Sequence, residues 1–150
     1  MTLEQDIGLL AHTRPFDLLP RDALKLIAFS AQRKKVSAGE GLFQQGDEAD
    51  CAYFVLSGSV VLTIYGKTEP KERVVGPGTL IGEIAMIASV TRPSSAHAKD
   101  DTIVLRIGRD LLGRVLAEFP RETARIRAAF AKRAKETVAE LENLRKRAMV

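Results

Sequence analysis

Tryptophan is absent from this sequence, and aromatic residues make up only 5% of it, so the core must be built mainly from aliphatic side chains. Cysteine occurs once, as Cys51, which excludes an intrachain disulfide and a zinc site made of several cysteines. No apolar run approaches the roughly 20 residues that span a bilayer, and no basic and then apolar leader opens the chain. These absences predict a cytoplasmic location and no membrane contact, with Cys51 as a small buried hydrophobe.

The residues that are present have the balance of a globular protein. Apolar residues supply 45% and charged residues 28% of the 150, which suffices for one domain with a real core. The net charge of +4 is uneven, since 12 Lys and Arg accompany 6 Asp and Glu from Arg106 onward. A basic C-terminal segment can bind nucleic acid or an anionic membrane, but it is more often the solvated face of an amphipathic helix. We favour the helix face and expect no nucleic-acid partner.

Glycine and proline divide the chain into parts. Residues 1–32 contain a single glycine, and Pro20 suits the start of a helix, so this part is predicted to be helical. Residues 33–108 hold eight short β-prone runs separated by turn residues, a pattern typical of a sandwich, barrel or roll. Leu56 to Ser59 is interpreted as a tight hairpin turn between two apolar strands. The eight runs are Val36–Ala38, Gly41–Gln45, Ala52–Leu56, Ser59–Tyr65, Arg73–Val75, Thr79–Ile81, Ser95–Ala98 and Thr102–Ile107.

Residues 109–150 return to a helical pattern that Pro120 interrupts. From residue 121 to 147 there is neither Gly nor Pro, which predicts one long helix. Small or apolar residues spaced alternately by four and three form a narrow seam along it that could pack on a partner helix of a homodimer. Ala and Thr weaken the seam, so it favours a modest contact over a permanent coiled coil. The seam comprises Phe130, Ala134, Thr137, Leu141, Leu144 and Ala148. The chain is therefore predicted to be one α+β domain over 1–150, with helices at 1–32, strands at 33–108 and helices at 109–150.

The segment most informative about function runs from Gly82 to Ser95. A predicted strand meets Gly82, one or two helical turns begin at Glu83, and Arg92 lies in the loop that returns to the next strand. Backbone N–H groups at a helix start favour an anion, and an arginine opposite them can bind phosphate in a bidentate fork. The carboxylate of Glu83 suits sugar hydroxyls, so the combination fits a ribose phosphate. The alternative is that Glu83 caps its helix and Arg92 pairs with a carboxylate.

This segment resembles the phosphate-binding cassette of the cyclic nucleotide-binding domain family, which includes the regulatory subunits of cyclic-AMP-dependent protein kinase, cyclic-nucleotide-gated channels and catabolite activator protein. The family pattern is Gly-Glu-(Leu/Ile)-Ala-Leu with an Arg nine residues after the Glu, and Glu83 and Arg92 have that spacing. The resemblance implies an eight-stranded, jelly-roll-like β-roll between N-terminal helices and a long C-terminal helix. Further motifs that are similar and stand in the family's order are Gly39-Glu40 with Phe43 to Asp47, Tyr53 to Val60, and Gly76-Pro77-Gly78.

The resemblance also implies a role for each residue of the cassette. Arg92 would hold the cyclic phosphate together with the backbone N–H of Ala85, while Glu83 with the Gly82 backbone would accept from the ribose 2′-hydroxyl. The base would lie against the roll beneath the C-terminal helix. Three residues of that helix are candidates for a lid over the base: Arg127, Phe130 and Arg133. The expected ligand-binding residues are Gly82, Glu83, Ile84, Ala85, Arg92, Pro93, Ser94 and Ser95.

Pro93 departs from the family pattern, in which many members have Ser, Thr or Ala after the Arg and use the N–H of that residue on the phosphate. Proline has no N–H, so one phosphate contact is missing or is supplied by the hydroxyl of Ser94 or Ser95. Thr or Ser at this position often assists cyclic GMP. Pro93 therefore favours cyclic AMP as the ligand over cyclic GMP.

The implied function is that of a sensor, in which the C-terminal helix passes ligand occupancy to an effector protein that the sequence does not identify. Neither catalysis nor a metal or other cofactor is expected, because Ser94 and Ser95 have no identifiable His or Asp partners and the two histidines are not at ligand spacing. Two alternatives stay open. Bacterial relatives often act at promoters, but residues 121–150 leave no room for a helix-turn-helix, so only the basic helix itself could contact DNA. The other alternative is a degenerate scaffold that no longer binds nucleotide.

Overall fold

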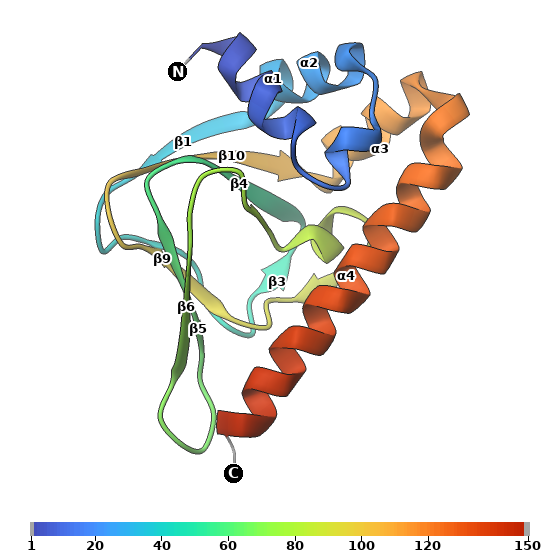
Figure 1. Cartoon of the computed structure of the whole chain (residues 1–150). Coiled ribbons are helices and arrows are strands. Elements are labelled where there is room, and N and C mark those ends of the chain that lie inside the picture. The colour runs from blue at the N-terminus through green and yellow to red at the C-terminus, as the bar shows by residue number, and fades with distance from the viewer. Residues whose placement is uncertain (1, 149–150) are drawn as a thin grey trace.

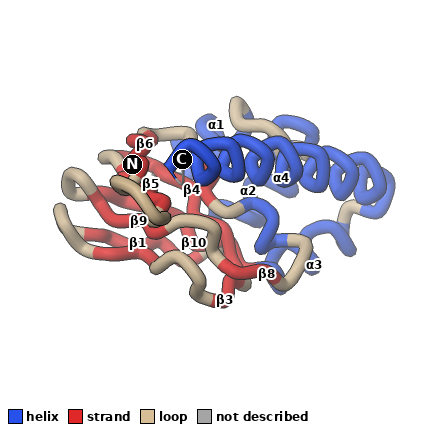
Figure 2. The backbone as a smooth tube through the Cα atoms, turned by 90° about the horizontal axis from the view of Figure 1, so that it is seen from below, coloured by secondary structure: helices blue, strands red, loops and turns tan. Residues whose placement is uncertain are grey.

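An N-terminal and a C-terminal group of helices pack against each other and against one β unit in the computed structural model, which describes residues 2–148 (Figure 1). The helices gather mostly on one side of the molecule and the strands on the other (Figure 2). No helix among the described residues is long and apolar enough to cross a membrane. The N-terminal group consists of α1 (Leu3–Ala11), the 3-10 helix η1 (Phe16–Leu18) and α2 (Arg21–Ser30), and the C-terminal group of α3 (Arg109–Glu118) and α4 (Pro120–Ala148).

Local signals set the helix starts. Thr2 Oγ1 accepts from the Gln5 N–H (3.2 Å) and Gln5 Oε1 accepts from the Thr2 N–H (2.8 Å), a reciprocal capping box that begins α1. Pro20 stands immediately before α2, where its missing N–H costs no helical hydrogen bond. Helix α3 follows the last strand without a loop, and the Arg109 N–H donates to the Asp50 carbonyl at 2.8 Å.

The eight predicted strands form two four-stranded antiparallel sheets, and both contribute side chains to one apolar cluster between them. The eight-stranded β-roll and the α+β class are thus confirmed. One sheet has the order β1 (Gln32–Val36), β10 (Thr102–Gly108), β4 (Cys51–Ser57), β7 (Leu80–Ile81). The other has the order β2 (Gly41–Phe43), β9 (Ser95–Ala98), β5 (Val60–Ile64), β6 (Lys71–Val75). Two further strands of two residues each, β3 (Glu48–Ala49) and β8 (Val90–Thr91), pair with each other.

Two local predictions about the strands are wrong. The pattern places the first strand at Val36–Ala38, but the strand spans Gln32–Val36, because pairing with β10 recruits a polar segment whose side chains are mostly exposed. The turn at Leu56 to Ser59 is not a hairpin, since β4 pairs with β10 and β7 whereas β5 pairs with β6 and β9. The turn instead carries the chain from one sheet to the other. Gly58 permits this corner, because its φ is +83° and a Cβ there would overlap the backbone of Thr102.

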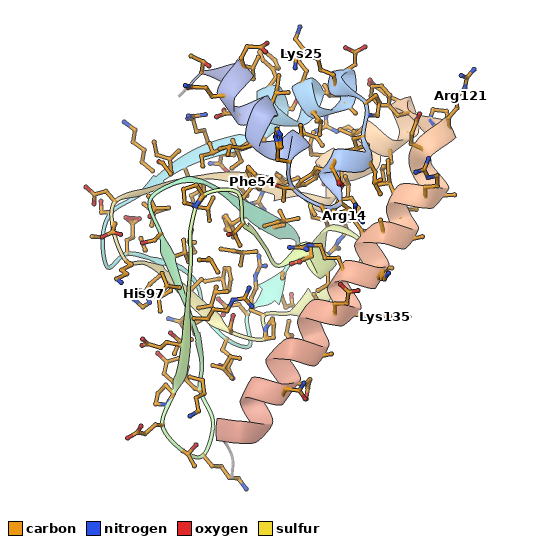
Figure 3. All side chains as sticks on the ribbon, viewed as in Figure 1. Arg14, Lys25, Phe54, His97, Arg121 and Lys135 are labelled. Carbon is orange, nitrogen blue, oxygen red and sulfur yellow. The ribbon has the colours of Figure 1, made fainter. Side chains whose placement is uncertain are left out.

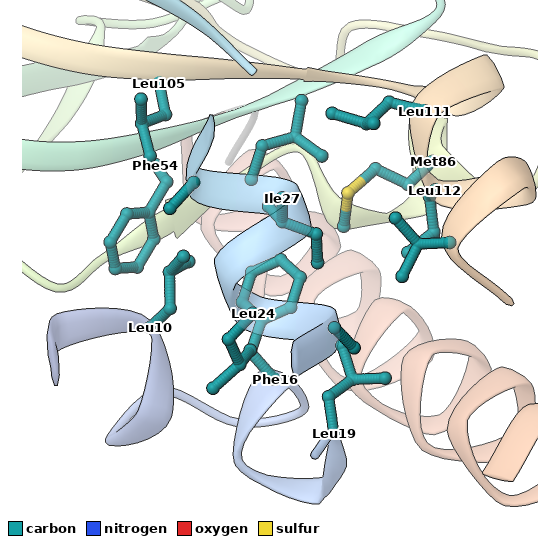
Figure 4. Close-up of a cluster of buried hydrophobic side chains, with 14 of the residues drawn as sticks. Leu10, Phe16, Leu19, Leu24, Ile27, Phe54, Met86, Leu105, Leu111 and Leu112 are labelled. Atoms are coloured by element: carbon teal, nitrogen blue, oxygen red, sulfur yellow. The ribbon is translucent and has the colours of Figure 1, made fainter. Parts of the chain in front are cut away.

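Apolar side chains form two clusters, one beneath the helices and one inside the roll. In the first cluster, the Phe16 ring meets the rings of Phe54 and Phe130 edge-on, with centroids 6.3 and 5.5 Å away. Leu, Ile and Met side chains fill the space around the rings of this cluster (Figure 4). Aliphatic residues outnumber rings in both clusters, in agreement with the low aromatic content.

Helix α4 begins beside α3 and runs along the roll towards the β5–β6 hairpin (Figure 1). Ile126 and Phe130 are fully buried and dock its first half on the helical core, whereas Arg121 is exposed and points away from the roll (Figure 3). Phe130, the first residue of the predicted dimer seam, therefore belongs to the core of its own chain, and the homodimer stays a prediction. The structure describes the helical backbone but not the side chains of the other seam residues: Ala134, Thr137, Leu141, Leu144 and Ala148.

Candidate functional site

A left-handed glycine sets the geometry of the cassette. Strand β7 ends at Ile81, Gly82 adopts φ +77°, and the chain then enters the 3-10 helix η2 (Glu83–Met86). A Cβ at position 82 would overlap Arg92 Nη1. Glycine is therefore required here both for the backbone turn and for the close approach of the arginine.

The small β3–β8 ladder, which the sequence pattern missed, holds the Arg92 backbone. The Arg92 N–H donates to the Asp47 carbonyl at 2.7 Å, and the Arg92 carbonyl accepts from the Gly46 N–H at 2.8 Å. Both bonds lie next to the pairing of Glu48 with Thr91. This ladder therefore fixes where the arginine side chain enters the roll.

The guanidinium of Arg92 lies inside the roll among weak partners. The residue is 5% exposed, and its Nη2 donates to Cys51 Sγ at 3.3 Å. Its Cζ lies 4.3 Å from the centre of the Phe43 ring and 5.7 Å from that of Tyr53. No described residue accepts a hydrogen bond from Arg92 Nε or Nη1. We call Phe43, Cys51 and Tyr53 the cradle of Arg92.

The cradle compensates the buried charge only in part. Desolvation of an ion costs several kcal/mol. Each desolvated cation–π contact returns on the order of 2 kcal/mol, sulfur is a weak acceptor, and neither replaces the hydrogen bonds that Arg92 Nε and Nη1 would make in water. Burial raises the pKa of the Tyr53 phenol, Cys51 raises it further, and Arg92 and Arg106 oppose the shift. The phenol is therefore uncharged at neutral pH and does not balance Arg92. The two nitrogens without an acceptor, Nε and Nη1, favour an anion, and no described carboxylate accepts from them.

Glu83, the second candidate contact of the cassette, is 2% exposed and is met by a cation from α4. Arg133 Nε lies 3.1 Å from Glu83 Oε1, and the Arg133 side chain is 36% exposed. The ion pair connects the cassette to the C-terminal helix. Glu83 therefore pairs with α4 and not with Arg92.

The other predicted ligand-binding residues differ in their exposure and in the hydrogen bonds that they make. The Ala85 N–H donates to the Gly82 carbonyl at 3.1 Å, which closes the 3-10 turn. Pro93 is exposed, Ser94 is 4% exposed, and Ser95 Oγ accepts from the Gln45 N–H at 2.8 Å. Ile84 is half-buried beside Ala85.

The three lid candidates separate clearly by position. Arg133 reaches the cassette, Phe130 is buried in the helical core, and Arg127 is exposed on α4. Of the three, Arg133 forms an ion pair with an expected ligand residue, Glu83.

The cradle contains three functional candidates that the sequence reasoning missed. Cys51 and Tyr53 alternate along β4 and so share one face of it, a period-2 signal that was available. Phe43 comes from β2, which belongs to the opposite sheet, so its contact with Arg92 depends on how the sheets pack. No pattern along the chain encodes that packing.

An open groove of about 800 Å³ follows β2 and β9 on the neighbouring surface. Phe43 and Ser95 line it, so the groove and the cradle share the Phe43 ring. His97 also lines this groove and lies on the β9 strand (Figure 3). The described residues contain no group of His, Cys, Asp and Glu able to hold a metal ion.

The β-roll, the left-handed Gly82 before Glu83 and the buried Arg92 define one class of protein, and comparison with known proteins agrees. The sequence profile described as cyclic nucleotide-binding domain matches residues 33–119. The chain belongs to the cyclic nucleotide-binding domain family.

The chain is similar to several particular proteins. Lysophospholipase nte1 of Aspergillus oryzae is 36% identical over 124 residues, which are 81% of this chain and 8% of that protein. The chain therefore spans less than a tenth of this curated relative. A cyclic nucleotide-binding-like protein from Brucella abortus has 39% identity and a TM-score of 0.69, over 75% of this chain and 97% of that chain. The regulatory domain of Toxoplasma gondii PKA, crystallised with cAMP, has 25% identity and a TM-score of 0.74, over 89% of this chain and 48% of that chain.

Proposed function

We propose that this chain binds a cyclic nucleotide, cyclic AMP in preference to cyclic GMP, and reports its occupancy through α4. The observation that carries the proposal is Arg92, a buried guanidinium whose Nε and Nη1 have no acceptor among the described residues. A cyclic phosphate carries one negative charge and presents two exocyclic oxygens. Its charge and its oxygens would offset the part of the Arg92 desolvation cost that the cradle does not offset.

Glu83, which directly follows Gly82, would accept a hydrogen bond from the ribose 2′-hydroxyl. Its carboxylate is 2% exposed and already lies 3.1 Å from Arg133 Nε. The ribose and α4 would therefore act on the same carboxylate. That shared group is the route by which we propose that ligand occupancy reaches the C-terminal helix.

The Arg133→Gln variant tests this route. We expect it to bind cyclic AMP about three- to ten-fold more tightly, because a partly exposed ion pair worth on the order of 1 kcal/mol no longer competes for Glu83. The ligand-induced slowing of amide exchange in α4 should shrink at the same time. Arg127→Gln, on the exposed side of the same helix, is the matched control. A wild-type exchange response in Arg133→Gln would contradict the proposed route.

Replacement of Pro93 tests the phosphate contact. Pro93→Ala restores a backbone donor near a charged acceptor, a bond worth roughly 1.5–3 kcal/mol, and a freer loop offsets part of that gain. Calorimetry should show cyclic AMP binding tightened by about three- to thirty-fold, with no gain for adenosine. Weaker binding in the variant would mean that proline shapes the loop and that Ser94 or Ser95 already supplies the contact.

The proposed role is regulatory and not catalytic. Lysophospholipase nte1 is more than ten times longer than the segment that matches this chain. We therefore propose that this domain acts on an effector, which is either a separate protein or another part of a larger assembly. We also propose a homodimer through the seam along α4, no nucleic-acid partner for the solvated basic face of that helix, and a cytoplasmic location with no membrane partner, since the sequence has no long apolar run.

Calorimetric titration with cyclic AMP, cyclic GMP and 5′-AMP tests the function directly. We expect saturable binding of one cyclic AMP per chain and weaker binding of cyclic GMP. Binding of 5′-AMP should be at least about ten-fold weaker, because its open phosphate is a dianion and Arg92 supplies only one positive charge. Absence of binding by all three nucleotides would remove the sensor function and favour an interaction scaffold.

A further inference from the structure

Arg109 donates to three backbone carbonyls that belong to separate parts of the site. Its Nε donates to the Ala85 carbonyl at 2.9 Å, and its Nη2 donates to the carbonyls of Ala49 at 2.9 Å and Ala88 at 3.0 Å. Ala85 lies in η2, Ala88 follows it, and Ala49 ends β3. The side chain is half-buried, so these bonds are only partly shared with solvent.

The same residue is the first residue of α3. Its own N–H donates to the Asp50 carbonyl at 2.8 Å, directly after the Ala49 carbonyl that the side chain holds. Helix α3 packs against both η2 and α4, and its inner face is buried in the helical core. Arg109 therefore links the cassette, the strand before the cradle and the helix that leads to α4.

The chemistry of the contact favours arginine specifically. Carbonyls at the end of a short helix carry partial negative charge, and a cation there stabilises them. The planar guanidinium presents several donors in a fixed fork, whereas a lysine ammonium is a compact point charge. The fork donates to three carbonyls that face it from different segments and keeps them at set positions, whereas the three donors of an ammonium rotate about one nitrogen.

We propose that Arg109 is a positioning residue that holds the end of the cassette to α3 and thereby makes α3 and α4 follow the cassette when ligand binds. This role rests on the proposed cyclic nucleotide binding, which takes place at Gly82, Glu83 and Arg92. The ligand would act on the beginning of η2, and Arg109 holds its end. A shift of η2 is transmitted to α3 through the carbonyls of Ala85 and Ala88.

The first arm of the test needs no ligand. Hydrogen exchange is measured on Arg109→Gln, Arg109→Lys and the control Arg114→Gln, whose site is exposed on the same helix. The relevant amides are those of Ile87 and Ala88, which donate to the Ile84 carbonyl at 3.1 and 3.0 Å. We expect these amides to exchange faster in Arg109→Gln, by about ten-fold, and to be unchanged in the control. Unchanged exchange in Arg109→Gln would show that Arg109 does not position the cassette.

The second arm adds cyclic AMP to the same proteins. We expect Arg109→Gln to bind about ten-fold more weakly and, at saturation, to lose the ligand-induced slowing of exchange in α3 and α4 that the control retains. Arg109→Lys should recover part of this response. If Arg109→Gln does not fold, Arg109→Lys takes its place in the test. A full response in saturated Arg109→Gln, or in Arg109→Lys if only that variant folds, would overturn the proposal. If the unchanged protein binds no cyclic nucleotide, the proposed function fails, and the first arm still decides whether Arg109 positions the cassette.

Discussion

Replacing Arg92 with alanine is expected to weaken cyclic AMP binding by about thirty-fold or more. The physical reason is the loss of a desolvated charge pair, for which removal of one partner costs roughly 2–5 kcal/mol. Folding should be little affected, because the guanidinium is buried without full compensation and its removal also removes a desolvation penalty. We expect the free energy of unfolding of the unliganded protein to change by less than about 1 kcal/mol.

Arg92→Met separates the charge from the shape. Methionine keeps an unbranched stem against the rings of Phe43 and Tyr53 but has no N–H to donate. It should lose affinity to the same extent as alanine, whereas Arg114→Met on the exposed face of α3 should bind as the unchanged protein does. An unchanged dissociation constant in both Arg92 variants would remove Arg92 from the site.

Replacing Phe130 with alanine is expected to lower the free energy of unfolding by about 3–5 kcal/mol, the usual cost of deleting a buried phenylalanine ring. Phe130 is 0% exposed and packs edge-on against Phe16 at 5.5 Å. The loss removes a fully buried anchor of α4, so amide protection in α4 should fall before that in the roll. Urea denaturation measures the first effect and hydrogen exchange measures the second.

Phe29 provides the matched control, because it is the same residue type on α2 and is 79% exposed. Phe29→Ala should change the free energy of unfolding by less than about 0.5 kcal/mol. Equal losses in the two variants would show that Phe130 does not anchor α4.

The fold could be predicted from the sequence where local signals repeat. Each of the eight strand runs is bounded by turn residues, and the cassette combines a fixed Gly-Glu pair with an arginine at a fixed distance. The β3–β8 ladder was missed because two residues are too few for any periodicity. The hairpin predicted at Gly58 is wrong because a tight turn between apolar strands does not reveal whether both strands stay in one sheet.

The site was predicted only where the chain itself brings residues together. Glu83 and Arg92 lie nine positions apart, so a family spacing could identify both. The cradle joins Phe43 to Cys51 and Tyr53 across the two sheets, and such contacts depend on packing. Arg109 is 24 residues from Ala85 and 60 from Ala49, and a single arginine at a strand–helix junction gives no sequence sign of its acceptors.

The Nε–H resonance of Arg92 in ¹H–¹⁵N spectra tests the central claim most directly, since this group has no acceptor among the described residues. The resonance is assigned by its absence in Arg92→Met. The account predicts that cyclic AMP moves it downfield and slows its exchange with water, while adenosine, which lacks the phosphate, leaves it in place. Saturating cyclic AMP binding with an unmoved Arg92 Nε–H resonance would contradict the account.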